Sequence, residues 1–132
     1  MVKLLGARKE AILHARDEDG VVVEEYRALY TTQALADAEI RMGKSVSEAL
    51  GGFVTGKSGV REVALLLQSG LEADRRATGS GKTPVSFNRA CEVLDMVGLT
   101  PAAKAIGDAI TAVLQHGETP EEDLQAEDDP NA

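Results

Sequence analysis

The sequence of 132 residues has a single cysteine, two histidines and no tryptophan. One cysteine permits no internal disulfide and cannot supply a cysteine-rich metal site. His14 and His116 lie far apart with no acidic or thiol partner at ligand spacing, so neither predicts a metal site or an acid–base pair. Cys91 falls on an apolar helical face, which favours a buried structural thiol. We therefore expect no enzyme, no cofactor and no metal.

Long apolar runs are also missing, since none approaches the roughly 18 residues that a membrane span needs. The beginning of the chain carries basic residues without an apolar run behind them, which is not typical of a secretory signal. We expect no membrane partner and a cytoplasmic, reducing setting.

The charge is unevenly distributed along the chain. Residues 117–132 hold seven acids and no lysine or arginine, while the remainder carries 15 acids and 14 bases. Such a segment cannot bury apolar surface, so we expect a flexible acidic tail over 117–132. A phosphate-binding face needs positive potential, and nucleic acid is therefore disfavoured as a partner.

We expect residues 1–116 to form one domain. The first part of this domain has the pattern of a β-hairpin, over residues 8–30. Two arms, 10–16 and 21–30, flank an acidic turn, and the second arm is rich in β-branched and aromatic residues. The alternation of the second arm is imperfect, and from Glu24 onward the chain could instead belong to a helix.

From Thr32 onward the pattern predicts four to five helices, so the fold class is mainly α. A first helix capped by Thr32 ends at Gly43, and a short one capped by Ser45 ends near residues 51–52. Ser58 begins an aliphatic helix over 60–71, and a polar, glycine-rich loop over 72–82 follows. Two further helices are expected to begin at Thr-Pro pairs, 83–84 and 100–101.

One segment matches the phosphate-binding pattern G-x-x-x-x-G-K-[ST]. Gly51, Gly56, Lys57 and Ser58 fill its fixed positions. The segment before it, 45–50, is too short and polar to be the buried parallel strand that such a loop requires. We therefore interpret these residues as a glycine link followed by a helix cap. Nucleotide binding is the alternative interpretation.

The order of elements resembles the phage tail assembly chaperone family of gene transfer agents and siphophages. The resemblance covers an extended lead-in with a first helix (30–45), the aliphatic helix ending in Ser69-Gly70-Leu71, and the closing helices (85–98 and 102–114). It implies a protein of the bacterial cytoplasm that binds the tape measure protein and recruits tail tube subunits. Such chaperones are absent from the finished particle. Self-association is a further option.

The family has no motif that assigns binding residues. We expect the first and third helices to form the core and part of a partner groove, through their aliphatic faces. The residues concerned are Leu35, Met42, Val63, Leu67 and Leu71. The alternative from another class is a small nucleotide-binding or phosphoryl-transfer protein that uses Lys57 and Ser58. A further alternative is a structural tail component of the particle, which requires more β-strand than the sequence predicts.

Overall fold

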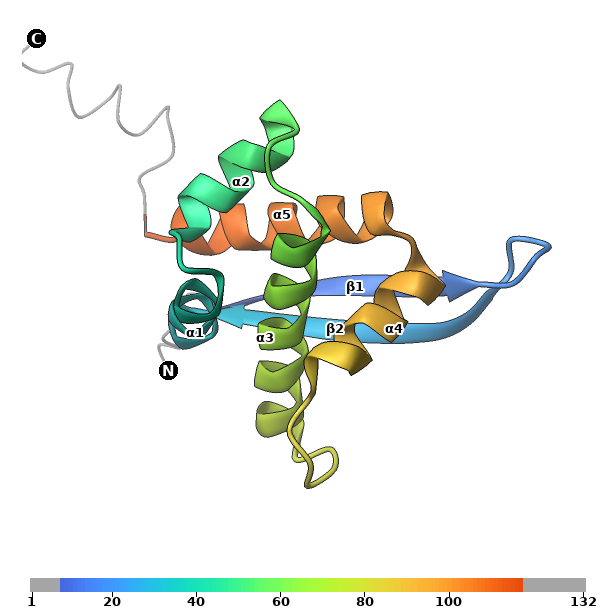
Figure 1. The fold of residues 1–132 in the computed structure, drawn as a ribbon. Helices are drawn as coiled ribbons and strands as arrows, with labels where there is room; N and C mark the ends of the chain where they lie inside the picture. Colours follow the sequence, from blue (N-terminus) through green and yellow to red (C-terminus); the bar gives the residue numbers. More distant parts are fainter. Residues whose placement is uncertain (1–7, 118–132) are drawn as a thin grey trace, which may run out of the picture.

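A computed structural model describes residues 8–117, which form a two-stranded hairpin followed by five helices (Figure 1). The mainly helical fold with an N-terminal hairpin, predicted from the sequence, is confirmed. The strands are β1 (Arg8–Arg16) and β2 (Val22–Thr31), and the helices are α1 (Thr32–Met42), α2 (Val46–Thr55), α3 (Val60–Thr78), α4 (Phe87–Val97) and α5 (Leu99–Leu114). The predicted acidic tail, except for Gly117, lies outside the described residues.

The hairpin is antiparallel, with Leu13 opposite Tyr26 and Ala11 opposite Ala28. Its turn is held by Asp17, whose Oδ1 accepts hydrogen bonds from the backbone N–H groups of Asp19 and Val21. This side chain replaces backbone bonds that the tight turn cannot make, which explains why the acidic turn predicted from the sequence forms.

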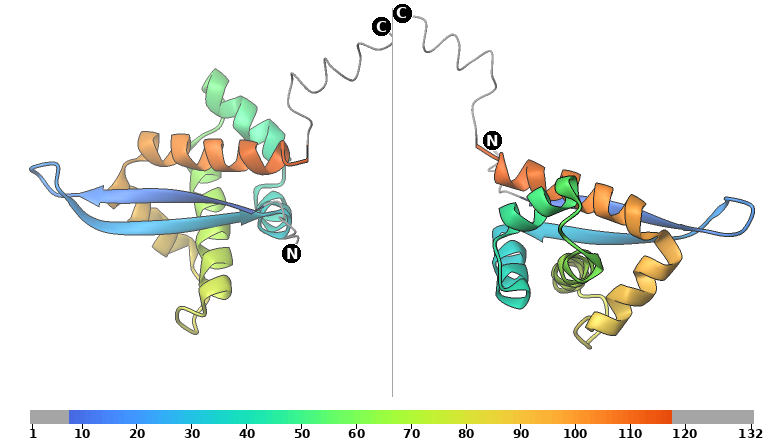
Figure 2. Two further views of the ribbon diagram at one scale, coloured as in Figure 1. Left: turned by 180° about the vertical axis from the view of Figure 1, so that it is seen from behind. Right: turned by 45° about the horizontal axis from the view of Figure 1, so that its top comes forward.

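The helices lie on one face of the hairpin. α3 crosses the strands and α5 runs along β1, and in the view from behind the strands pass in front of α3 and α4 (Figures 1 and 2). The core is one cluster shared by strands and helices, and alternate residues of each strand supply it. Its largest fully buried side chains are Tyr30, Leu13, Leu66, Leu67, Ile106, Ile110, Val46 and Val93.

Several helix ends differ from the sequence prediction. α1 is capped by Thr31 and α4 by Ser86, whose hydroxyl accepts from the Arg89 N–H, so the predicted caps at Thr32 and Thr83 were wrong. α5 begins at Leu99, so Thr100 is not its cap. Gly98 takes positive φ between α4 and α5 and ends α4 as predicted.

α3 is longer than predicted and reaches Thr78, so the expected loop over 72–82 begins only after that residue. Its added turns hold Glu, Ala and Arg, which are good helix formers. Gly79 then ends the helix in the left-handed conformation that glycine adopts without strain.

Candidate functional site

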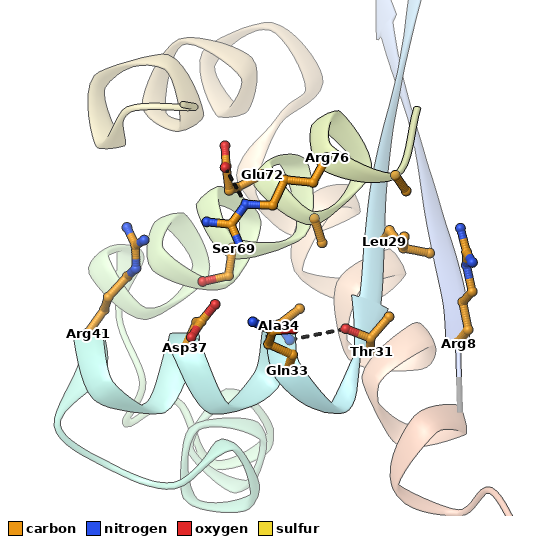
Figure 3. A pocket seen from close by; sticks show the side chains of 12 residues that line it. Arg8, Leu29, Thr31, Gln33, Ala34, Asp37, Arg41, Ser69, Glu72 and Arg76 are labelled. Carbon is orange, nitrogen blue, oxygen red and sulfur yellow. Dashed lines mark hydrogen bonds and ion pairs between the residues drawn. The ribbon is translucent and has the colours of Figure 1, made fainter. Parts of the chain in front are cut away.

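A pocket of about 270 Å³ lies between α1 and α3, where these helices meet the ends of the two strands (Figure 3). The α1 side supplies Gln33, Asp37 and Arg41, and the α3 side supplies Ser69 and Arg76. Its lining mixes polar side chains with small apolar ones, and polar groups in a pocket can fix the orientation of a ligand.

Ser69 is the buried polar group of this pocket. Its residue is 4% exposed, and its Oγ has no hydrogen-bond partner among the described residues. Figure 3 shows the side chain leaving α3 toward α1. A buried hydroxyl without a partner is costly, so native proteins rarely keep one without a ligand or an ordered water.

Arginine side chains border the same pocket. Arg8 and Arg41 form no ion pair with any residue in the described range, whereas Arg76 donates to Glu72 at 2.8 Å. Asp37 contributes one carboxylate between them. The charged groups therefore sum to a small positive charge that lies close to the buried hydroxyl.

Glu72 is the best-connected charge of the site. It is 6% exposed, and its carboxylate accepts hydrogen bonds from Arg75, Arg76 and the backbone N–H of Val85. These bonds, that from Arg75 above all, lower the pKa of Glu72 to about 2. The carboxylate is thereby held ionised, and it ties the end of α3 to the segment that leads into α4.

The residues of the phosphate-loop pattern form the end of a helix instead. Gly51 belongs to α2, and Gly56 is its left-handed cap. The N–H groups of Lys57 and Ser58 donate to the Gly52 carbonyl at 2.7 and 3.1 Å. In a phosphate loop, such N–H groups point at the ligand. Here these N–H groups donate to a carbonyl of the chain itself, and no strand precedes the segment. The segment therefore lacks the geometry of a nucleotide-binding loop.

Ser58 also has a role that the sequence did not predict. It is not the cap of α3, because Gly59 occupies that position and its N–H donates to Glu62 at 2.8 Å. The Ser58 hydroxyl instead donates to the Ala49 carbonyl at 2.8 Å, which ties the α2–α3 link back to α2. The end of α2 also differs from the prediction: the helix was expected to end near residues 51–52, and it runs on to Thr55.

Residues expected to form a partner groove lie in the core. Leu35, Val63 and Leu67 are buried, and Met42 and Leu71 are partly buried against the same cluster. The expectation that these residues build the core holds, but in this conformation the three buried side chains offer no surface to a partner.

The other singled-out residues form no site together. His14 Nε2 lies 3.5 Å from Glu25 Oε2 across the hairpin, and Cys91 is half-buried against the core. Within residues 8–117 no three His, Cys, Asp or Glu side chains are placed to hold a metal ion. No single helix in that range has the length and apolar character to cross a membrane; α4 and α5 meet the requirement only jointly, and they are bent by 111°.

Sequence reasoning missed Ser69, Arg8 and Arg41. One signal was present, because Gln68 and Ser69 interrupt an otherwise aliphatic helical face. Gln68 finds a partner in the Val85 carbonyl at 3.1 Å, and Ser69 does not.

Comparison with protein-family models, curated proteins and solved structures gives no match for this chain.

Proposed function

We propose that this chain is an assembly chaperone for a long, non-contractile tail of a phage or phage-like particle. It binds the tape measure protein, recruits tail tube subunits and leaves before the particle is complete. The role is non-enzymatic. The observation that carries the proposal is the resemblance of residues 30–45 and the helices after them to the tail assembly chaperone family.

Part of the element order agrees with the resemblance: an extended lead-in runs directly into α1, and α4 and α5 close the chain after the aliphatic α3. Two elements differ from it, since the helix α2 occupies most of the expected glycine-containing link and α3 continues past Leu71 to Thr78. A small helical domain of this kind supports the proposal because a partner helix can pack on exposed apolar side chains.

The hairpin tip is the surface that we assign to the partner. Val21, Val22 and Val23 are 57%, 42% and 62% exposed, and they lie where the hairpin extends beyond the helices (Figure 1). Adjacent exposed apolar side chains are typical of a binding surface. We therefore place an apolar segment of the tape measure protein on these three valines, in place of the buried Leu35, Val63 and Leu67.

The test is purification of the tagged chain from cells that are producing particles. Changing Val21, Val22 and Val23 together to threonine keeps β-branching and volume but adds hydroxyl groups. We expect the variant to lose most of the co-purifying tape measure protein, measured by mass spectrometry. A variant with Val54→Thr and Val60→Thr is the control, since both valines are exposed, at 89% and 58%, on helices.

Equal recovery of the tape measure protein with both variants would rule out the hairpin tip as the contact. Failure of the unchanged protein to recover any tape measure protein would contradict the proposed function itself. A helical circular dichroism spectrum for each variant shows that the fold is retained.

A further inference from the structure

We propose that the pocket between α1 and α3 is a carboxylate-binding site for the chain's own acidic segment, residues 118–132. The inference does not depend on the proposed function. It combines three observations: a buried hydroxyl and two arginines at the pocket for which residues 8–117 supply no hydrogen-bond partner and no ion pair, and a strongly acidic sequence after Gly117, at the same end of the fold.

The Ser69 hydroxyl is the donor that the pocket leaves unused. The hydroxyl is buried and directed toward α1, and Gln33 lines the cavity from that side (Figure 3). A hydroxyl and a side-chain amide can both donate to a carboxylate oxygen. A hydrogen bond to a charged group contributes more than one between neutral groups, so a carboxylate compensates the buried hydroxyl best.

The charges of the pocket favour an anion. Arg8 lies at the start of β1 and Arg41 in the last turn of α1, so two guanidinium groups border the cavity from different elements. Glu72 is already paired with Arg75 and Arg76, which leaves Asp37 as the opposing carboxylate of the lining. Asp74 lies outside the lining and interacts electrostatically with Arg8 without forming an ion pair. Arginine binds carboxylates through paired N–H donors, and this favours a carboxylate over a compact halide or a neutral group.

The acidic segment starts close enough to reach the pocket. The beginning of α5 packs near the far end of β1, where Pro101 and His14 line one recess. The end of α5 therefore lies toward the start of β1, which carries Arg8 (Figure 1). The fifteen residues after Gly117 hold seven acids and no base, and at about 3.3 Å per residue they can span roughly 50 Å.

The test compares amide NMR spectra of the full chain and of a full-length variant in which the seven acids become amides. The changes are Glu118→Gln, Glu121→Gln, Glu122→Gln, Asp123→Asn, Glu127→Gln, Asp128→Asn and Asp129→Asn. We expect the resonances of Gln33, Arg41 and Ser69 to shift in the variant. Adding a synthetic peptide of residues 118–132 to the variant should move them back, and 0.5 M salt should weaken that response.

Matched substitutions show whether the pocket carries the effect. In the amide variant, Arg41→Gln should raise the Kd of the peptide about two- to fivefold, whereas Arg61→Gln, on the exposed start of α3, should leave it unchanged. Ser69→Ala should also weaken peptide binding. As a control for charge alone, Glu18→Gln with Asp19→Asn at the hairpin turn should leave the Ser69 resonance in place.

Three outcomes would overturn the proposal. The first is an amide variant whose Gln33, Arg41 and Ser69 resonances match those of the unchanged chain. The second is a peptide response confined to residues outside the pocket. The third is a pocket response to a tape measure segment but none to the acidic peptide, which would assign the site to a partner.

Discussion

The ring of Tyr30 occupies the space that a side chain at position 70 would need. A Cβ on Gly70 would lie 2.6 Å from Tyr30 Cζ and 2.8 Å from the Cβ of Ala28. α3 therefore crosses β2 at a distance that glycine permits, and this contact sets how close the helix lies to the hairpin. The "SGL" step of the proposed family resemblance thus has a structural reason in this chain.

Gly70→Ala should destabilise the fold by about 1–3 kcal/mol, because fixed ring and methyl groups must move to admit the new Cβ. Gly51→Ala is the matched control, since Gly51 is also helical but has open space around it. Alanine there should raise stability by about 0.5–1 kcal/mol. Urea unfolding measures both, and equal effects would contradict the close approach of α3 to β2.

Tyr30→Phe tests the polar end of the same contact. The Tyr30 hydroxyl is buried and donates to the Leu66 carbonyl at 2.8 Å. Its removal should cost about 0.5–1.5 kcal/mol of unfolding free energy. Tyr26→Phe, which removes a hydroxyl from a partly buried ring and its long 3.6 Å contact to the Met96 sulfur, should cost less. A larger loss for Tyr26→Phe would show that the Leu66 bond contributes little.

The Glu72 carboxylate should make stability depend on pH at the acidic end. Its pKa is about 2 in the folded chain against an ordinary 4.5. The stabilising contribution is therefore fully present above pH 4.5 and is lost as the pH falls from 4.5 toward 2. Glu72→Gln should reduce this part of the acid dependence and cost about 1–3 kcal/mol at pH 7, because three donors lose a charged acceptor.

Urea unfolding of the unchanged chain and of Glu72→Gln between pH 2 and pH 7 measures the effect. Exposed Glu48→Gln, at the start of α2, is the control. A Glu72→Gln profile parallel to that of the unchanged chain would contradict the pKa assigned to Glu72.

The link between α2 and α3 gives a prediction on the phosphate-loop pattern. A Cβ on Gly52 would lie 2.8 Å from Ser58 Cβ and closer still to Ser58 Oγ. Gly52→Ala should therefore destabilise the fold, and adding Ser58→Ala should recover part of the loss, so that the two changes are not additive.

Lys57→Ala should change neither stability nor ATP binding; calorimetry with the unchanged chain should detect no ATP binding at millimolar nucleotide.

The sequence was informative where side chains act locally. Gly43 and Gly98 end helices as predicted, and Ser45 caps α2, because caps and stops depend on a few adjacent residues. The end of α2 was wrong because glycine pairs usually end helices, whereas Gly52 is needed inside this one for its contact with Ser58.

Longer-range features were not predictable from one sequence. The polar stretch after Leu71 was expected to be a loop, but it belongs to α3, where Glu72 accepts a hydrogen bond from the N–H of Val85 in the segment that leads into α4. The pocket at Ser69 likewise combines residues from β1, α1 and α3, and no spacing in the sequence brings these together.

The central claim, that the chain assists assembly and then leaves, is tested most directly by comparing two samples by quantitative mass spectrometry. One is the material that co-purifies with the tagged chain from cells producing particles, and the other is the purified particles. The account predicts a very long helical protein and the tube subunit in the first sample, and none of this chain in the second. The chain at fixed stoichiometry in particles would contradict the account and make it a structural component.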